Sequence, residues 1–387
     1  MINGAYRFPR QDTVIYGRPA AEAVSDLAKR YGASRVLILT TRSLGGPSGL
    51  AAKLAGQLGA LCVGTFEAIA SHSPRADVIA GAEAARHANA DLLVALGGGS
   101  VIDATKLMQL CLWAGLTQTD ELGPYRLGRG DDRKDPRTIA SGIRMIAIPT
   151  TLSAAEFTPT AGVTDGEKKV KEAYTHPDMA PRAVVLDPAL ALATPPRLWF
   201  STGMKAIDHA VEQLCNPERA PLSDALAAEG LSLLASGLAD CRDNPEDIEA
   251  RARCQHGMWL AISGAAAGRG MGASHAIGHT LGGSYDIPHG ITSCITLHGV
   301  LAWNRDYSRD QQALVSKLMG KRALPAADVV RDLVKSLGLP WRLSEVMLGR
   351  SHFRAIAEHT MHDRGVRTNP RPIRSADDIV DILELCA

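Results

Sequence analysis

Residues 92–106 read LLVALGGGSVIDATK, and this stretch decides the fold. It joins a run of apolar residues to a helical pattern through three consecutive glycines and a serine. An uninterrupted apolar run of this kind is typical of a strand that is buried on both faces of a parallel sheet. The stretch therefore predicts a strand, a tight turn and a helix of an open α/β sheet.

The glycine turn also predicts an anion-binding site. Glycines let the backbone approach a ligand closely, and the following helix begins with unpaired N–H groups and a positive dipole end. A purely structural turn needs one glycine, whereas this one has three. We expect a phosphate or pyrophosphate to bind here, with an ordinary tight turn as the alternative. The candidate residues are Gly97, Gly98, Gly99, Ser100 and Asp103.

Strands and helices alternate on both sides of this turn, as far as about residue 190. Such a β-α-β rhythm indicates an open parallel sheet with crossover helices. The expected strands are 13–17, 35–41, 61–66, 91–100, 145–151 and 182–188, and the expected helices are 19–32, 49–60 and 76–90.

Beyond residue 190 the alternation stops and only helical spacing remains. Paired prolines and an extended strand exit place the boundary near residues 188–196, so we expect an α/β domain at 1–190 and an all-helical domain at 191–387. The polar segment 128–136 is expected to be a solvated loop. The expected helices of the second domain are 195–214, 222–241, 247–268, 327–338 and 375–386.

Composition excludes several classes of protein. The 387 residues are enough for two domains, and a formal net charge of +1 gives no reason to expect nucleic acid or an anionic membrane as a partner. The longest uncharged apolar run, 258–268, is too short to span a bilayer and reads as an interior helix. Seven scattered cysteines without a CxxC pair, and no secretory pattern at the N-terminus, suit the reducing cytoplasm.

A second polar cluster follows the expected strand 145–151. Thr150, Thr151 and Ser153 lie where that strand ends. Hydroxyl groups at the carboxyl end of a sheet strand are well placed for ribose and phosphate oxygens. Taken alone, the cluster would also suit an ordinary loop with turn-forming residues.

Four histidines could converge in the second half of the chain. His275 and His279 are four residues apart and share a helix face. His289 follows after a Gly-Gly break and a proline, and His209 belongs to a separate expected helix. Three imidazoles would make a reasonable zinc or iron(II) site, whereas isolated buried histidines are often only hydrogen-bonded core residues.

In this order, the motifs resemble the iron-containing alcohol dehydrogenase family nearly from end to end. The resemblance implies a dinucleotide-binding α/β domain followed by an all-helical domain, which is the dehydroquinate synthase-like architecture. It also implies a homodimeric NAD(P)-dependent oxidoreductase that acts on CH–OH groups. The motifs are VIYG (14–17), GGGSVIDATK (97–106), IPTTLSAAEFT (148–158), GMKAIDHAVE (203–212), GHTLGGSYDIPHG (278–290) and NPRP (369–372).

The resemblance also implies roles for the site residues. The glycine turn with Ser100 would hold the cofactor pyrophosphate, and Thr150, Thr151 and Ser153 would line its nicotinamide half. His279 would lie beside the nicotinamide and the substrate rather than on a metal.

The chain departs from the family where members hold their metal. Their ligands, an aspartate and three histidines, map here to Lys205, His209, His275 and His289. An ammonium about 4 Å from a divalent ion would be repelled by roughly 8 kcal/mol at an effective dielectric constant near 20. We therefore expect no tightly bound catalytic metal. The chain resembles the maleylacetate reductase branch, which also lacks the aspartate, although that branch carries asparagine there and has a different histidine segment.

We expect Lys205 to take the place of the metal by stabilising the developing oxyanion, with His279 or His209 completing a proton relay. One alternative makes Lys205 a surface residue that pairs with Asp208 or Glu212. Another keeps iron or zinc on the three ligand-position histidines.

The residues at the end of the expected strand 35–41 indicate whether the chain prefers NADH or NADPH. Thr41 and Arg42 lie where NAD-specific relatives usually carry an acid for the ribose hydroxyls. Without that acid a 2′-phosphate is not repelled, and the guanidinium could bind it. We expect the chain to use NADPH as well as NADH, or in preference to it.

The expected function is reduction of a small aldehyde, ketone or oxo acid, and a cationic pocket would favour carboxylate-bearing substrates. A metal-dependent alcohol dehydrogenase is the first alternative. A dehydroquinate synthase-like lyase is another, but it needs a richer basic pocket than the sequence shows near the histidines. A chain that has lost catalysis and serves only in binding is the last.

Overall fold

The computed structural model describes residues 6, 8–128, 132–166, 170–218, 220–265 and 270–387. These residues form two compact units, divided between Ala193 and Thr194. The division falls inside the expected boundary region, slightly beyond residue 190. The expected 1–190 domain needs one correction at its N-terminus. Tyr6 belongs to the helical unit, where its hydroxyl donates to the carbonyl oxygen of Ser263 at 2.8 Å.

The first unit, residues 8–193, is built on a six-stranded parallel sheet. Its strand order is β1-β8-β5-β4-β2-β3, so chain neighbours β3 and β4 lie on opposite sides of β2. Each strand lies where its apolar run predicts it. The strands are β1 (Thr13–Tyr16), β2 (Val36–Leu39), β3 (Cys62–Phe66), β4 (Leu92–Gly97), β5 (Arg144–Pro149) and β8 (Ala183–Leu186).

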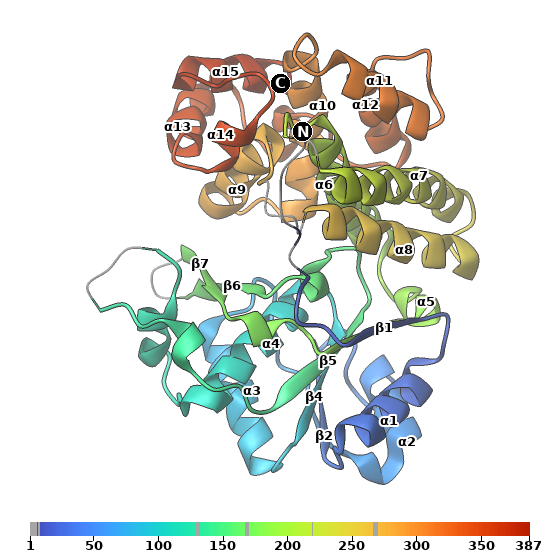
Figure 1. The fold of residues 1–387 in the computed structure, drawn as a ribbon, viewed down its shortest axis with the longest axis vertical. Helices are drawn as coiled ribbons and strands as arrows, with labels where there is room; N and C mark the ends of the chain where they lie inside the picture. Colours follow the sequence, from blue (N-terminus) through green and yellow to red (C-terminus); the bar gives the residue numbers. More distant parts are fainter. Residues whose placement is uncertain (1–5, 7, 129–131, 167–169, 219, 266–269) are drawn as a thin grey trace. The chain divides into compact units, whose positions relative to one another are not determined.

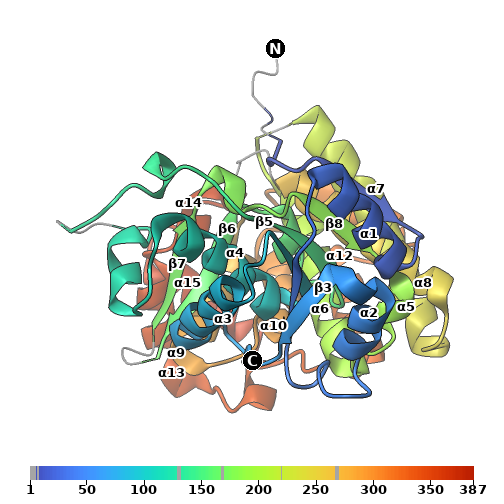
Figure 2. The same cartoon turned by 90° about the horizontal axis from the view of Figure 1, so that it is seen from below.

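Helices cover both faces of this sheet. The helices α1 (Ala20–Tyr31) and α2 (Leu50–Leu58) pack on one face, and α3 (Arg75–His87) and α4 (Gly99–Ala114) pack on the other (Figures 1 and 2). Because the crossover helices change face between β2 and β4, a crevice is expected there at the carboxyl ends of the strands. The short helix α5 (Pro188–Ala191) ends the unit.

A two-stranded antiparallel sheet was not expected from the sequence. It pairs β6 (Thr160–Asp165) with β7 (Val170–Thr175). Its strands carry polar residues that are paired in the interior. The buried guanidinium of Arg75 contacts Asp165 at 3.1 Å, the hydroxyl of Tyr174 at 2.9 Å and the carboxylate of Glu172. Of the expected loop 128–136, residues 129–131 lie outside the described part of the chain.

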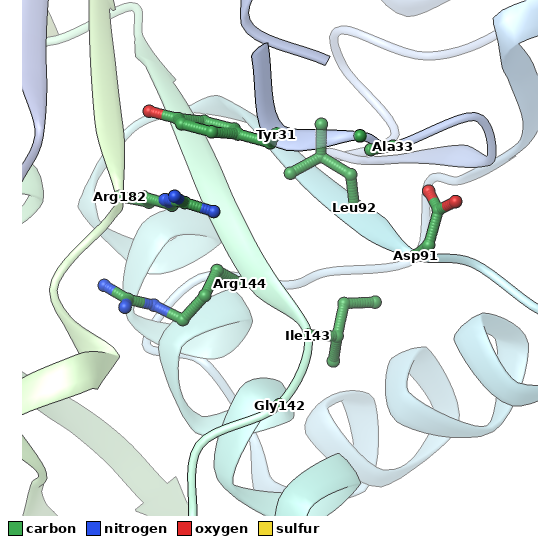
Figure 3. A pocket seen from close by; sticks show the side chains of 9 residues that line it. Tyr31, Ala33, Asp91, Leu92, Gly142, Ile143, Arg144 and Arg182 are labelled. Carbon is green, nitrogen blue, oxygen red and sulfur yellow. The ribbon is translucent and has the colours of Figure 1, made fainter. Parts of the chain in front are cut away.

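A pocket of about 350 Å³ opens at the amino edge of the sheet (Figure 3). Arg144 and Arg182 lie along one side of it and Asp91 along the other. Arg182 stacks on the ring of Tyr31 at 3.8 Å and pairs with Asp12, and Arg144 donates to two backbone carbonyls. This pocket lies at the opposite edge of the sheet from the glycine turn, so we do not identify it with the expected cofactor site.

The second unit, residues 194–387, has only helices in its described part. The helices expected from the sequence are present, and further ones carry the histidine segment and the C-terminal region. The helices are α6 (Pro196–Cys215), α7 (Pro221–Asp243), α8 (Ile248–Ala265), α9 (Ala273–Tyr285), α10 (His289–Trp303), α11 (Arg309–Leu318), α12 (Ala326–Ser336), α13 (Arg350–Thr360), α14 (Gly365–Thr368) and α15 (Ala376–Glu384).

Helices α7 and α8 pack side by side along their length (Figure 1). Their backbones approach closely because glycines face each other at the contact, among them Gly230 and Gly257. This packing fits the interior helix expected around 258–268, of which residues 266–269 lie outside the described part. Among the described helices, α7 alone is long and apolar enough to cross a membrane, a test that core helices also pass.

The close approach of α7 and α8 predicts that Gly230→Ala lowers the free energy of unfolding by about 1–3 kcal/mol. An added Cβ would lie 2.8 Å from the carbonyl oxygen of Gly257 and 2.8 Å from the amide of Ala261, and neither backbone atom can turn aside. The matched control is Gly56→Ala in α2, where a Cβ meets no atom within 4 Å and alanine favours the helix. Chemical denaturation compares them, and a Gly230→Ala protein as stable as the wild type would contradict the close packing.

Candidate active site

The residues expected to bind the cofactor end three adjacent strands of the first unit. The strand β4 lies between β2 and β5, so the segments that follow these strands share one edge of the sheet. Thr41 follows β2, the glycine turn ends β4, and Thr150 follows β5. The amide of Thr150 donates to the carbonyl oxygen of Gly97 at 3.0 Å, which joins two of the segments directly.

Glycine is required in the turn after β4. Gly97 has φ +154°, and a Cβ there would lie 2.7 Å from a methyl group of Val101. A Cβ on Gly98 would lie 2.9 Å from the methyl carbon of Thr151, and one on Gly99 would lie 3.0 Å from the hydroxyl of Ser153. The turn therefore packs directly against the threonine loop, and no side chain of the described residues caps the N-terminus of α4.

Two hydroxyl groups in the threonine loop are suited to a ligand. The Oγ1 atom of Thr151 and the Oγ atom of Ser153 are buried and have no hydrogen-bond partner among the described residues. Buried polar groups are nearly always hydrogen-bonded, so orphaned hydroxyls beside an uncapped helix N-terminus fit a polar ligand such as a dinucleotide.

Asp103 has a structural role in α4. One carboxylate oxygen pairs with the buried ammonium of Lys106 at 3.1 Å, and the other accepts from the amide of Gly162 at 3.0 Å. The aspartate thus ties α4 to β6, and its expected contact with the cofactor stays a prediction. Ser100 accepts from the amide of His72 at 3.1 Å.

A carboxylate that sequence reasoning missed lies near Thr41. Glu67 follows β3, which neighbours β2, and it accepts from the amide of Gly46 at 2.8 Å in the loop after β2. Thr41 contacts the hydroxyl of Ser43 at 2.9 Å, and Arg42 is exposed. Only the sheet order, which the sequence does not show, brings Glu67 beside this loop.

In the helical unit, α6 presents Lys205, Asp208, His209 and Glu212 at helical spacing of three and four residues. Lys205 is half-buried and the other three side chains are buried. The surface-pair alternative for Lys205 needs these carboxylates at the surface. The structure buries both carboxylates, so this face of α6 is not at the surface. The role of Lys205 stays a prediction.

The four expected imidazoles converge. The rings of His209 and His275 stack with centroids 4.9 Å apart, and those of His279 and His289 stack at 5.4 Å. The ring of His275 lies 6.2 Å from that of His279 and 6.3 Å from that of His289. The Gly-Gly break and the proline between α9 and α10 therefore return the chain to the same cluster.

Glu212 fixes the start of α9 and one edge of His275. Its two carboxylate oxygens accept from the amides of Gly272 and Ser274, each at 2.7 Å. One of them also lies 2.9 Å from Nδ1 of His275. A carboxylate at a helix N-terminus is stabilised by the helix dipole, which helps to keep this acid in the interior.

Asp208 adds a second buried acid on the same side of His275. Its carboxylate accepts from the hydroxyl of Ser274 at 2.8 Å and lies 3.5 Å from Nδ1 of His275. Burial raises the pKa of Asp208 to about 7 and that of Glu212 to about 7. Asp208 thus lies, with Glu212, on the Nδ1 side of His275.

The two inner imidazoles are neutral at pH 7. Burial lowers the pKa of His275 to about 4, although Asp208 acts in the opposite direction. Burial also lowers the pKa of His209 well below its ordinary value. The positive charge of Lys205 also contributes to the lowering of both pKa values.

Some features of the cluster suit a divalent cation and others oppose it. Nδ1 of His209 and Nε2 of His275 are buried without a hydrogen-bond partner among the described residues, as free ligands would be. The acids, however, lie at the other ring nitrogen of His275, and Lys205 adds positive charge. Ligand atoms of Asp208, Glu212 and His275 lie within 4.8 Å of one another. Both carboxylate oxygens of Glu212 already accept hydrogen bonds, whereas Oδ1 of Asp208 has no partner among the described residues.

His279 has a carboxylate partner that sequence reasoning also missed. Its Nδ1 lies 2.8 Å from the carboxylate of Asp363, which precedes α14. The side chain of His279 is 52% exposed, unlike the buried His209 and His275. Asp363 is 84 residues away in sequence and belongs to no motif, so no local signal pointed to it.

Comparison with known proteins identifies the family. The model of iron-containing alcohol dehydrogenase matches residues 11–188, and that of the C-terminal part of the Fe-containing alcohol dehydrogenase family matches residues 199–386. Maleylacetate reductase 2 of Cupriavidus pinatubonensis (strain JMP 134 / LMG 1197) is 32% identical, over 96% of this chain and 93% of its own length.

Solved structures agree with this assignment. The crystal structure of maleylacetate reductase from Rhizobium sp. strain MTP-10005 matches with a TM-score of 0.82 and 30% identity, covering 100% of this chain and 98% of that one. The structure of 1,3-propanediol oxidoreductase matches with a TM-score of 0.87 and 25% identity, over 99% and 100%. The chain therefore belongs to the iron-containing alcohol dehydrogenase family and is an NAD(P)-dependent oxidoreductase that resembles the maleylacetate reductases.

Proposed function

We propose that this protein reduces a small oxo acid, ketone or aldehyde with NAD(P)H and without a catalytic metal, with maleylacetate-type acids as the favoured substrates. The observation that carries the proposal is the half-buried Lys205, whose charge acts on neutral His209 and His275 where the family resemblance places a metal.

Lys205 stabilises the oxygen that becomes negative during reduction. When bound, NAD(P)H would supply a hydride to the carbonyl carbon, and the carbonyl π pair would move onto oxygen. The ammonium of Lys205, held in a partly desolvated cluster, would stabilise the negative charge on oxygen without a reorganisation of solvent. His279 would donate the proton that completes the alcohol.

The charge arrangement favours a substrate that carries a carboxylate. The inner imidazoles are neutral, and the two acids of α6 are turned to α9 and Nδ1 of His275. Lys205 is therefore the group of this helix face that can attract an anion. Several relatives are maleylacetate reductases by name, which supports an oxo acid with this chemistry.

The first unit supplies the proposed cofactor site. Gly97, Gly98, Gly99 and Ser100 would hold the pyrophosphate at the start of α4. Thr150, Thr151 and Ser153 would line the nicotinamide half, where the two orphaned hydroxyls offer hydrogen bonds. A cytoplasmic location and a homodimer remain predictions from the sequence.

A cofactor-consumption screen tests the reaction class. We expect the purified protein to oxidise NADPH or NADH with maleylacetate, other oxo acids, ketones or aldehydes, at equal rates before and after dialysis against a chelator. Activity that is lost with the chelator and restored by iron or zinc would favour the metal-dependent alternative on His209, His275 and His289. No consumption with any carbonyl substrate would favour a lyase or a chain without catalysis.

Replacing Lys205 tests its role. Lys205→Met should lower kcat/KM by about 10²- to 10³-fold while the Kd of NADPH, measured by fluorescence, changes little, because the amine acts only on the developing oxyanion. Lys317→Met, at an exposed lysine of α11, is the matched control. Full activity of Lys205→Met would remove the proposal.

The reciprocal variant asks whether the amine occupies the metal's place. Lys205→Asp restores the family's carboxylate beside the three imidazoles, so it should bind about one zinc or iron ion per chain by elemental analysis. A variant that binds no more metal than the wild type would show that the charge of Lys205 is not what excludes the ion.

Cofactor preference is tested at Arg42. We expect KM for NADPH to be equal to or below that for NADH. Arg42→Ala should raise KM for NADPH about tenfold without changing KM for NADH, since only the 2′-phosphate would lose a charged hydrogen bond. A strong preference of the wild type for NADH would contradict this and would point instead to the carboxylate of Glu67.

A further inference from the structure

We propose that Asp363 is a positioning residue that holds His279 with its Nδ1 protonated, so that Nε2 is the nitrogen that delivers the proton to the reduced oxygen. The inference deepens the proposed function and rests on the role given there to His279. It names a carboxylate that no family motif in the chain contains.

The geometry of the pair fixes both partners. One carboxylate oxygen of Asp363 lies 2.8 Å from Nδ1 of His279, and the other accepts from the amide of Gly365 at 2.8 Å. Partial burial acts to raise the pKa of Asp363, but the hydrogen bonds from His279 and Gly365 outweigh it and hold that pKa below its ordinary value. The group is therefore a carboxylate, which accepts and cannot donate, so the proton of the pair lies on Nδ1.

The segment that carries Asp363 is anchored to α9 on both sides of it. Upstream, the hydroxyl of Thr360 donates to that of Thr280 at 3.0 Å. Downstream, the hydroxyl of Thr368 donates to the carbonyl oxygen of Met271 at 2.5 Å. Figure 1 shows α13 and α14 beside α9, so a loop distant in sequence is held against the helix that carries His279.

The NPRP segment, residues 369–372, extends this anchor to α10. Asn369 and Asn304 exchange two amide hydrogen bonds, at 2.8 Å and 2.9 Å. The guanidinium of Arg371 stacks on the ring of Trp303 at 3.9 Å and donates to its carbonyl oxygen at 3.2 Å. Both asparagines are buried, so the contact fixes the chain that follows Asp363.

The pair differs from the inner carboxylate–histidine pair in its access to solvent. Glu212 and His275 are buried, whereas the side chains of Asp363 and His279 are 26% and 52% exposed. The ring of His279 also lies parallel to that of His289, with an interplanar angle of 3°, which restricts its rotation. One edge of the ring of His279 is thus held on a carboxylate while half of the side chain stays open to solvent.

The proposed step transfers a hydride to the carbonyl carbon and a proton to the carbonyl oxygen. The C4–H bond of NAD(P)H breaks and a C–H bond forms at the carbonyl carbon. The π pair moves to oxygen, which takes the proton of the Nε2–H bond of the imidazolium. The electron pair of the broken N–H bond stays on Nε2. Nδ1 keeps its own proton, which is hydrogen-bonded to the carboxylate of Asp363. The carboxylate stabilises the imidazolium before transfer and selects the tautomer after it.

Asp363→Asn tests the inference with a variant that keeps the shape of the side chain. Its carbonyl oxygen can still accept from Gly365, while its amide would donate to Nδ1 of His279 and shift the ring proton to Nε2. We expect ¹⁵N-histidine NMR to show this reversed tautomer. We also expect kcat with NADPH and maleylacetate to fall about 10- to 100-fold, with KM for NADPH within twofold, because general-acid transfer alone is impaired.

Three further proteins complete the experiment. Asp381→Asn, at an exposed aspartate of α15, controls for loss of one negative charge and should match the wild type in both measurements. Asp363→Glu should restore the wild-type tautomer and part of kcat. His279→Ala should lower kcat at least as much as Asp363→Asn does, because it removes the donor itself.

The outcomes separate the inference from the proposed function. An unchanged tautomer in Asp363→Asn, or unchanged kcat together with a large loss in His279→Ala, overturns the role of Asp363 and leaves the reductase proposal intact. If the wild type consumes no NAD(P)H with any carbonyl compound, or if His279→Ala keeps full kcat, the proposed function or the role of His279 fails instead. A parallel loss of melting temperature and of kcat, with the tautomer unchanged, would mean a structural role only.

Discussion

The hydrogen bonds between Glu212 and the first turn of α9 are the interaction on which the helical part of the site depends. Two backbone amides at the positive end of a helix and Nδ1 of His275 meet one carboxylate from α6. This contact sets the distance between two helices and turns the other ring nitrogen of His275 away from the acids. The two acids thus lie on the Nδ1 side of His275, and the charge of Lys205 lowers the pKa of His209 and of His275.

An amine in this place has a different chemistry from a metal. It is attached covalently, so its occupancy does not depend on the supply of an ion, and it contributes one positive charge rather than two. Its effect depends on neutral neighbours, and burial keeps His209 and His275 in that form. Under the proposed function, the site combines imidazoles typical of a metal centre with the electrostatics of an organic cation. The side chains of Asp363 and His279 are more exposed than those of His209 and His275, which suits them to the proposed proton transfer.

Much of the fold could be read from the sequence because buried parallel strands are continuous apolar runs and the glycine turn is unmistakable. The pair β6 and β7 could not, since its few buried apolar residues alternate with polar ones, and Asp165, Glu172 and Tyr174 are polar partners of the buried Arg75. The histidines were predictable from spacing and family resemblance. Asp363 and Glu67 were not, because tertiary contacts alone bring them to their partners. Glu212 follows His209 at helical spacing, so its place on the same helix face could be predicted. Its partners could not be, because they belong to α9, which lies about 60 residues further along the chain.

The two orphaned hydroxyls in the first unit have a consequence for the lifetime of the protein. A buried polar group without a partner costs about 1–3 kcal/mol, and Thr151 and Ser153 each contribute one beside the glycine turn. A dinucleotide that satisfies them would stabilise the folded α/β unit in proportion to its saturation. The cofactor would then stabilise the folded protein as well as take part in the reaction, and a low cofactor concentration would shorten the lifetime of the folded enzyme.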